Sequence, residues 1–456
     1  MATIYQITSM KKIFFCCFLV FNFLSTKAQY ILPVKEQAKV VDEILNERLN
    51  LLLPKLMEEN KIDMWVIISR EYNEDPVLKT MLPATWLSAR RRTLLVFYHD
   101  PVTKTYEKLA IARYGVGDQV KASWDMKKFP DQWDALVDII TSRNPKKIAL
   151  NYSKDFAHAD GLTYTEEKLL RSKLSPVFQA KITSAEPLAI GWLETRTEKE
   201  MQLYPQLIQL THAIIEEGFS EKVVMPGITT TDDLVWWFRQ KVRNLGLDTW
   251  FHPSVSIQRN DPENFEHLRA FSNRPKDEVI RTGDLLHVDI GITYLRLNTD
   301  VQEHAYILQP GETAPPPSLT KAFRNGNRLQ DILTSQFALG KTGNQILADA
   351  LAQATKENIV ASIYTHPIGY HGHAAGPTIG LWDQQTGVPG SGDFPLHANT
   401  AYSIELNASI DIPEWKKSIR IMLEEDGYFT GTQFRFISGR QKELLVIPRA
   451  KPQLGQ

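Results

Sequence analysis

Cysteine is almost absent from this chain: among its 456 residues the only two are Cys16 and Cys17. Both lie in an apolar stretch close to the N-terminus, so a chain that begins at about Gln29 carries none. This excludes a disulfide framework, a thiol nucleophile and a cysteine-ligated zinc site from the rest of the chain.

An excess of charge of one sign is also missing. The chain has 52 basic and 53 acidic residues and a formal net charge of −1. A nucleic-acid-binding domain usually carries a basic patch, and an interaction tail usually carries a long run of like charge. With 43% hydrophobic and 23% charged residues, the composition is that of a globular protein long enough for two or more domains. We therefore expect a globular protein without a nucleic-acid partner.

The N-terminal apolar run, residues 13–24, is too short to cross a membrane, which takes roughly 20 apolar residues. It follows Lys11 and Lys12 and precedes the small residues of 25–28, which is the layout of a secretory signal peptide. We predict that residues 1–28 are this signal peptide, and an uncleaved anchor is the alternative. The protein is then secreted or periplasmic and has no membrane partner after cleavage.

Residues 29–190 have the pattern of a first, α/β domain. Continuous apolar runs at 64–69 and 93–98 predict buried strands, whereas helical spacing of apolar residues occurs at 40–60 and 132–143. Strands that alternate with helices predict a mixed sheet covered by helices. No catalytic motif stands out in this part of the chain.

Residues 191–456 have a pattern of helices, strands, helices and strands again. Capping boxes at Thr197 and Thr342 predict two helix starts. Of eleven histidines, eight lie from His252 onward, so a metal or acid–base site is expected in this second domain.

Two carboxylates lie on neighbouring predicted strands. The runs at 285–290 and 297–307 are separated by a glycine-containing segment, which predicts a hairpin, and they contain Asp289 and Asp300. An acid in an apolar strand is costly to bury unless it is paired or binds a metal. In the second run, alternate side chains share one face of the strand: Asp300, Gln302, His304 and Tyr306.

Three later stretches contain further candidate ligands. Residues 366–376 are glycine-rich and hold three histidines, whereas Glu405 and Glu424 each lie in or at the end of a strand-like run. Taken one at a time, loop histidines and strand acids of this kind are usually exposed to solvent.

Taken together, these residues resemble the M24 metallopeptidase family of methionine aminopeptidase, aminopeptidase P and prolidase, which has the pita-bread or creatinase-like fold. The matching stretches, in chain order, are Asp289-Ile-Gly291, Asp300 eleven positions on, Gly372-His373-Ala-Ala-Gly376, Ile404-Glu405 and Glu424-Glu-Asp426. The resemblance covers residues 190–450 well and residues 30–190 more weakly. It implies an α/β (α+β) protein with a C-terminal pita-bread catalytic domain, 191–456, and a smaller N-terminal mixed-sheet domain, 29–190.

The resemblance also implies two divalent metal ions. Their expected ligands are Asp289, Asp300, His373, Glu405 and Glu424. Oxygen-rich sites with one imidazole suit Mn²⁺, Co²⁺, Zn²⁺ or Fe²⁺ rather than soft ions, and Mn²⁺ is our first expectation. In the family, a hydroxide that bridges the two ions attacks the scissile amide. Glu405 is then both ligand and proton acceptor, and His267, His366 and His371 are candidate catalytic histidines.

The chain departs from the family's motifs at three points. The second acid usually lies in S-D-x-T-R, whereas residues 299–303 lack the arginine. A second histidine usually follows the metal-binding one by seven positions, where this chain has Gly380. The histidine segment is also longer than usual. His371 is therefore an alternative ligand to His373, and a third alignment places Pro377 at the ligand position and implies a lost site.

We predict a secreted dinuclear-metal aminopeptidase of the Xaa-Pro aminopeptidase or prolidase type, which hydrolyses peptide bonds near a free N-terminus. The alternatives are a metal-free creatinase-like C–N hydrolase and a non-catalytic pita-bread binding protein. The full set of four carboxylates favours the first reading, because neither alternative needs all four. A homodimer is expected only by analogy with relatives.

Overall fold

The computed structural model describes residues 31–100, 102–261 and 278–449. The predicted signal peptide and His267 lie outside these residues. The chain divides into a short unit, Met1–Leu32, and a large unit, Pro33–Gln456. The large unit contains every element discussed below. None of the described helices is both long enough and apolar enough to cross a membrane.

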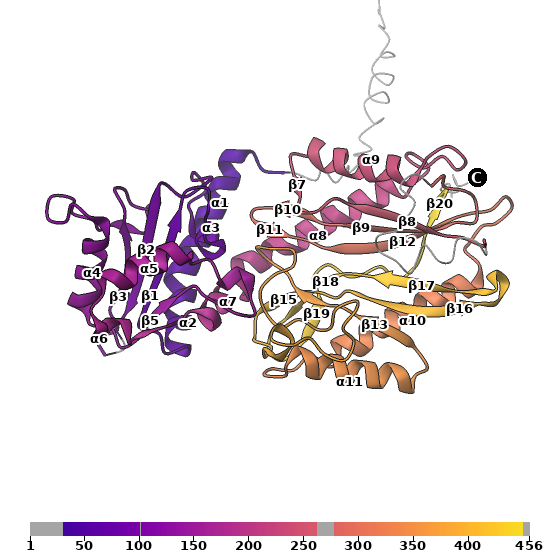
Figure 1. The fold of residues 1–456 in the computed structure, drawn as a ribbon. Coiled ribbons are helices and arrows are strands. Elements are labelled where there is room, and N and C mark those ends of the chain that lie inside the picture. Colours follow the sequence, from indigo (N-terminus) through magenta and orange to yellow (C-terminus); the bar gives the residue numbers. More distant parts are fainter. Residues whose placement is uncertain (1–30, 101, 262–277, 450–456) are drawn as a thin grey trace, which may run out of the picture. The chain divides into compact units, whose positions relative to one another are not determined.

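The N-terminal part of the large unit is built on one six-stranded sheet with the strand order β4-β3-β2-β1-β5-β6 (Figure 1). Strand β1 pairs antiparallel with β2 and parallel with β5, which confirms the predicted mixed sheet. The strands are β1 (Met64–Arg70), β2 (Arg92–His99), β3 (Tyr106–Ile111), β4 (Lys121–Ala122), β5 (Ile148–Leu150) and β6 (Ile182–Ser184). The helices are α1 (Val34–Glu47), the π-helical η1 (Arg48–Leu52), α2 (Leu53–Glu59), α3 (Pro76–Met81), α4 (Gln132–Arg143), α5 (Tyr164–Lys173), α6 (Pro176–Gln179), α7 (Glu186–Glu194) and the 3₁₀-helix η2 (Ala157–Ala159).

The central strand β1 is apolar along its length because each of its faces is buried in a different core. Trp65 and Ile67 belong to the cluster that includes residues of α2 and α7. Met64, Val66 and Ile68 belong to the cluster that includes residues of α4 and α5. A strand covered on both faces has no need of alternating polar residues, which explains the continuous apolar run in the sequence.

In the C-terminal part, the described residues form four smaller sheets, with the strand orders β20-β12-β9-β8, β14-β15-β18-β19, β13-β16-β17 and β11-β10-β7. The strands are β7 (Asp248–Thr249), β8 (Ser254–Gln258), β9 (Leu285–Ile290), β10 (Ile292–Tyr294), β11 (Leu297–Asn298), β12 (Val301–Ile307), β13 (Val360–Ile363), β14 (His366–Pro367), β15 (Thr400–Ser403), β16 (Leu406–Ile412), β17 (Lys417–Leu423), β18 (Asp426–Phe429), β19 (Phe434–Phe436) and β20 (Leu445–Ile447). The helices are α8 (Glu198–Gly218), α9 (Thr231–Asn244), α10 (Pro317–Thr334), α11 (Gly343–Lys356) and the 3₁₀-helices η4 (Ser391–Asp393) and η5 (Pro413–Trp415).

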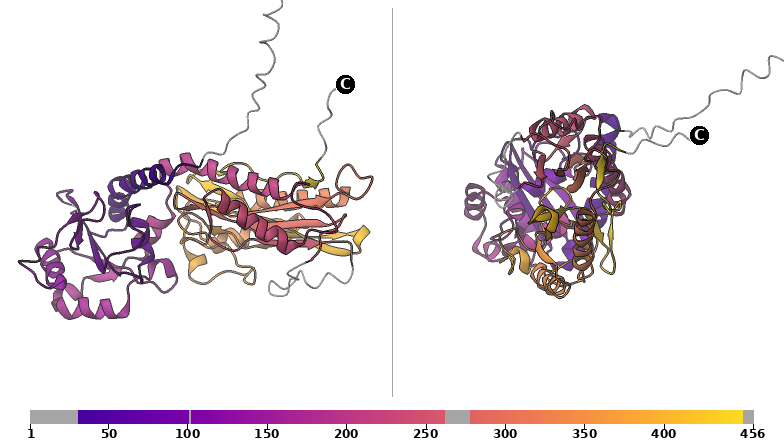
Figure 2. Two further views of the ribbon diagram at one scale, coloured as in Figure 1. Left: turned by 90° about the horizontal axis from the view of Figure 1, so that it is seen from above. Right: turned by 90° about the vertical axis from the view of Figure 1, so that its right-hand side faces the viewer.

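Two pairs of helices cover these sheets. Helix α8 contacts β10 and β12, and α9 contacts β7 and β8, whereas α10 contacts β16 and β17, and α11 contacts β13. In Figure 1, α9 lies on one side of these strands and α11 on the other, and Figure 2 shows the same elements from two further directions. This layering matches the pita-bread architecture that the sequence predicts.

The two predicted capping boxes are present and show why these helices begin where they do. The Thr197 side chain accepts a hydrogen bond from the backbone of Glu200, whose carboxylate accepts one from the backbone of Thr197. Thr342 and Gln345 form the same reciprocal pair at the start of α11. Each box satisfies two backbone N–H groups that have no partner within the helix.

The predicted hairpin of residues 285–307 is confirmed, with one difference. Strands β9 and β12 pair antiparallel in the register that sets Gln302 opposite Asp289. The second predicted strand, 297–307, is interrupted, because β11 pairs with β10 in a separate sheet before β12 begins at Val301. Asp300 falls in this interruption, where the backbone leaves one sheet and enters the next.

Residues of the two predicted domains meet in a buried ion pair. The guanidinium of Arg48 lies 2.9 Å from Glu200 of α8, and both side chains are 0% exposed. Helix α7 spans the predicted boundary near residue 190, and Leu188, Ile190 and Trp192 pack in the N-terminal core. The position of the domain boundary stays a prediction.

Candidate metal centre

Four segments place carboxylates at one point of the C-terminal part. Asp289 lies near the end of β9 and Asp300 just before β12. Glu405 lies in the two-residue link between β15 and β16, and Glu424 directly follows β17. All four positions are at strand ends or strand junctions, where the backbone turns and side chains from different sheets can converge.

His366, the first residue of β14, faces three of these acids. Its Nε2 atom lies 3.4 Å from Oε1 of Glu424, 3.7 Å from Oδ2 of Asp300 and 4.0 Å from Oε2 of Glu405. The pairing of β14 with β15, which sets His366 opposite Ser403, brings the imidazole to the acids.

Three overlapping groups in this region have ligand atoms within 4.8 Å of one another and could hold a metal ion. They are Asp289, Asp300 and Glu424; His366, Glu405 and Glu424; and Asp300, His366 and His373. Glu424 is shared by the first two groups, and Asp300 by the first and third. Carboxylates that are shared between overlapping groups in this way are able to bridge neighbouring cations.

Burial of these acids is costly in the absence of a cation. Burial, together with the negative charges of Glu424, Asp289 and Glu405, raises the pKa of Asp300 well above its usual range. Burial and the charges of Glu424 and Asp289 also raise the pKa of Glu405. Clustered carboxylates either take up protons or bind cations, and a divalent ion removes the repulsion.

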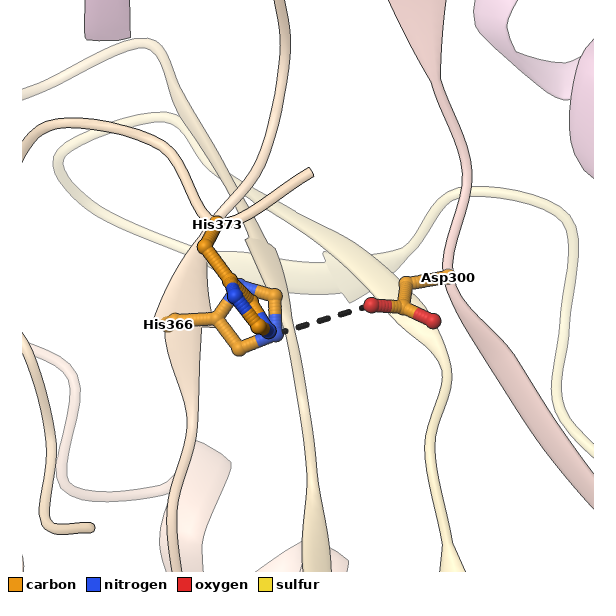
Figure 3. A group of neighbouring side chains, drawn as sticks. All are labelled: Asp300, His366 and His373. Carbon is orange, nitrogen blue, oxygen red and sulfur yellow. Dashed lines mark ion pairs between the residues drawn. The ribbon is translucent and has the colours of Figure 1, made fainter. Parts of the chain in front are cut away.

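The histidines of residues 366–376 take up different positions. The ring of His373 is exposed and lies 4.6 Å from that of His366 between ring centroids, and both rings lie beside the Asp300 carboxylate (Figure 3). The ring of His371 lies 4.4 Å from that of His158 instead. Burial and the neighbouring His158 lower the pKa of His371 to about 4. Among the described residues, the groups that could hold a metal include His366 and His373 but not His371.

Steric contacts explain why the third position of the D-x-G motif is glycine. A Cβ atom on Gly291 would lie 2.1 Å from Nε1 of Trp250 and 2.5 Å from the carbonyl oxygen of Thr299. That indole donates a hydrogen bond of 2.8 Å to the same Thr299 oxygen, next to Asp300. The ring of Trp250 also packs at 5.2 Å against that of His373. Trp250 therefore contacts both the backbone next to Asp300 and the ring of His373, which the sequence did not indicate.

Other polar side chains that hold the acids were missed by sequence reasoning. The hydroxyl of Ser403 donates a hydrogen bond of 2.7 Å to Oε1 of Glu424. Oδ2 of Asp426 accepts one of 3.2 Å from the backbone of Asp300. Gln302 contacts both Glu405 and Glu424. The signal for Gln302 was present in its strand parity with Asp300, whereas the roles of Ser403 and Asp426 depend on contacts between distant segments.

The donor set fits divalent cations. Among the described residues, the buried Oδ1 of Asp300 and Nε2 of His366 have no hydrogen-bond partner. Buried polar atoms are rarely left in this state unless they have another ligand. Carboxylate oxygens with one or two imidazoles suit Mn²⁺, Co²⁺, Fe²⁺ or Zn²⁺, and the absence of thiolates disfavours soft ions.

Comparisons with known proteins agree with this picture. The family model of metallopeptidase family M24 matches residues 204–428. No curated protein matches the chain. Among solved structures, the X-Pro aminopeptidase from Thermotoga maritima is 18% identical, with a TM-score of 0.59 over 86% of this chain and 99% of that one. The Xaa-Pro dipeptidase from Bacillus anthracis is 16% identical, with a TM-score of 0.58 over 91% and 100%. The prolidase from Pyrococcus furiosus is 15% identical, with a TM-score of 0.52 over 85% and 99%. At identities this low, the similarity to these structures establishes the fold alone.

Proposed function

This chain belongs to metallopeptidase family M24, and from this premise we propose that it is a secreted aminopeptidase of the Xaa-Pro aminopeptidase or prolidase type, with two divalent ions. It would hydrolyse a peptide bond near a free N-terminus. The observation that carries the proposal is the convergence of four acids and His366, from five separate segments, in two groups that share Glu424, with ligand atoms within 4.8 Å of one another in each group. Similarity to solved structures named as X-Pro aminopeptidase, Xaa-Pro dipeptidase and prolidase supports the choice of substrate.

We propose that one ion is held by Asp289, Asp300 and Glu424, and the other by His366, Glu405 and Glu424. The second set uses His366 where the sequence suggested His373, because Nε2 of His366 faces three of the acids. When bound, Mn²⁺ or a similar ion polarises the scissile carbonyl and makes a water molecule acidic enough to react near neutral pH.

The chain's own groups can handle the protons of such a hydrolysis. The side chain of Glu405 is 16% exposed, compared with 4% for Asp300 and 1% for Glu424, so substrate and solvent reach it more readily. We assign Glu405 as the proton acceptor. The ring of His373 is exposed and lies next to the buried His366, and we propose that it stabilises the substrate carbonyl or protonates the leaving amine.

Metal content and peptidase activity test the proposal together. The protein purified without chelator should contain divalent metal and cleave Xaa-Pro peptides, and EDTA should abolish cleavage until Mn²⁺ is restored. Asp289→Asn should lose metal and activity while it keeps the fold. Asp232→Asn, an exposed acid in the first turn of α9, is the matched control and should retain both.

Two outcomes would contradict the proposal. Cleavage of a C–N bond that persists in EDTA would indicate a metal-free creatinase-like hydrolase. Absence of both metal and activity in the wild-type protein would indicate a binding protein with this fold.

Export is a separate part of the proposal and has its own test. Expression of the full chain in a Gram-negative host should give a periplasmic protein whose N-terminus lies near residue 29. Intact mass of the recovered protein measures the cleavage point, and a full-length cytoplasmic product would contradict export. Light scattering on the same sample would test the dimer expected by analogy.

A further inference from the structure

Gln302 lies against two of the four acids. Its Nε2 atom donates a hydrogen bond of 2.6 Å to Oε1 of Glu405 and another of 2.6 Å to Oε2 of Glu424. A primary amide has two N–H hydrogens, so these bonds use both. The residue is 4% exposed, which means that water does not compete for the amide.

The backbone of Gln302 is tied to one of the same acids. Its N–H donates a hydrogen bond of 3.0 Å to the carbonyl of Glu424, and the N–H of Glu424 donates one of 3.4 Å in return. This isolated bridge joins β12 to the residue that follows β17. Side chain and backbone therefore hold Glu424 at two points.

His287 fixes the direction in which the amide points. Its Nε2 atom lies 2.8 Å from Oε1 of Gln302. As ligands of a metal ion both carboxylates are ionised and only accept hydrogen bonds, so in the metal-bound site the NH₂ group faces Glu405 and Glu424, and the amide oxygen faces His287. His287 then donates from Nε2. The two residues meet because Gln302 pairs with Asp289 across the β9–β12 ladder, two positions from His287 and on the same face.

The hydrogen bonds leave the opposite oxygens of the two acids directed at His366. Gln302 binds Oε1 of Glu405 and Oε2 of Glu424. The other two oxygens, Oε2 of Glu405 and Oε1 of Glu424, are the ones that lie 4.0 and 3.4 Å from Nε2 of His366. These three atoms belong to the residues of the second proposed ion position, His366, Glu405 and Glu424. The amide thus binds the oxygen of each acid that is turned away from His366, while Oε1 of Glu424 also accepts the hydrogen bond from Ser403.

Gln302 occupies the threonine position of the family motif S-D-x-T-R, so this arrangement differs from the one that the motif describes. A threonine hydroxyl has one hydrogen on a shorter side chain and cannot donate to both acids at once.

We propose that Gln302 is a positioning residue that orients Glu405 and Glu424 toward a divalent ion, and that His287 sets the orientation of its amide. The inference rests on the proposed metal centre. Groups that hydrogen-bond metal ligands typically change metal affinity 10–100-fold when they are removed.

Titration of the chelator-treated full-length protein with Co²⁺ tests the role of Gln302. Visible absorption of Co²⁺ reports both affinity and ligand geometry, and it does not depend on peptidase activity. Gln302→Met keeps the length of the side chain without its donors and should weaken Co²⁺ binding about 10–100-fold, with an altered spectrum. Should this variant fail to fold, Gln302→Thr supplies one donor and should weaken binding less.

His287 provides an independent arm. His287→Phe removes the donor that orients the amide and should weaken Co²⁺ binding in the same direction. His287→Gln keeps a donor and should restore most of the affinity, a rescue that a purely structural role would not give. Gln330→Met, at a fully buried glutamine of α10 whose amide has no hydrogen-bond partner in the described part of the chain, is the matched control and should bind Co²⁺ like the wild type.

The possible results distinguish a failure of the proposed role of Gln302 from a failure of the proposed metal centre. Unchanged affinity and spectrum in the folded Gln302 variant, while Asp289→Asn loses metal, would overturn the role of Gln302 alone. An equal loss in Gln330→Met would overturn it as well. No Co²⁺ binding by the wild-type protein would overturn the metal centre itself, and the role of Gln302 with it.

Discussion

The Nε2 atom of His212 in α8 lies 2.9 Å from Oε2 of Glu425 and 3.8 Å from Oε1 of Glu303, so one imidazole faces two buried carboxylates. Burial disfavours the charged imidazole, but the charges of Glu425 and Glu303 outweigh it and raise the pKa of His212 to about 9. Glu303 stands where the family motif has arginine. The chain thus carries an acid at that position and supplies the compensating positive charge from a helix.

His212 should make stability depend on pH. A group whose pKa is raised on folding stabilises the protein fully below its unfolded pKa, about 6.5 for histidine, and loses that contribution as the pH rises through about 9. His212→Asn should therefore lower the free energy of unfolding by on the order of 2 kcal/mol near pH 6 and by clearly less above pH 9. Urea unfolding in EDTA at both pH values measures the difference. An equal loss at both would contradict the charged ion pair.

The metal ligands should destabilise the metal-free protein. Because burial and neighbouring acids raise the pKa of Asp300, its carboxylate favours folding less as the pH rises above the unfolded value of about 4. At pH 7 in EDTA, Asp300→Asn should raise the free energy of unfolding by about 1–2 kcal/mol. With Mn²⁺ the order should reverse, because only the wild type gains stability from the bound ion. Lower stability of the variant in EDTA would contradict this account.

Substitution of each of the three histidines of residues 366–376 should have a different effect on metal content and activity. His366→Ala should lose metal and activity, since its Nε2 faces three acids. His373→Ala should retain most of the metal but lose about 10²–10⁴-fold in kcat, the usual loss for an acid–base group. His371→Ala, whose ring lies against His158, should retain the metal. Metal analysis with steady-state kinetics decides the order, and metal loss confined to His373→Ala would favour the ligand that the sequence suggested.

Removal of one partner of the buried ion pair of Arg48 and Glu200 should destabilise the protein, because the other charge stays buried. Arg48→Met leaves the Glu200 carboxylate with Arg196 as its remaining cationic partner, at 3.4 Å. Removal of one partner of a buried pair costs about 3–5 kcal/mol. Thermal unfolding should show this loss, and Lys39→Met, in an exposed pair with Glu36, is the control with little effect. Equal losses in the two variants would contradict the prediction.

Sequence reasoning was sufficient for features set by local pattern. Two apolar runs separated by a glycine-containing segment predicted the hairpin of β9 and β12. The alternation of side chains along a strand predicted that Gln302 lies on the same face as Asp300. Both capping boxes lie where threonine and its partner three residues later predicted them. Continuous apolar runs in the sequence predicted strands of the N-terminal sheet, and strand β1 is indeed buried on both faces.

The assignment of the histidines could not follow from sequence. Within residues 366–376 three imidazoles lie on irregular backbone, so spacing does not determine which one turns toward the acids. His366 is directed there by the pairing of β14 with β15, between residues that are 37 positions apart, His366 and Ser403. The hydrogen bonds of Ser403 and Gln302 to Glu424 likewise depend on how separate sheets meet. The domain boundary, the site roles and export stay predictions.

The loop of residues 308–316, between β12 and α10, separates the proposed ligands into two sets along the chain. Asp289 and Asp300 precede it, whereas His366, Glu405 and Glu424 follow it. A polypeptide divided in this loop would give a C-terminal fragment with every proposed donor of the second ion but only Glu424 of the first, whose other donors, Asp289 and Asp300, lie in the N-terminal fragment. Binding of a second equivalent of cobalt or manganese by a mixture of the fragments would therefore report their reassembly, which makes this loop a useful place to split the protein.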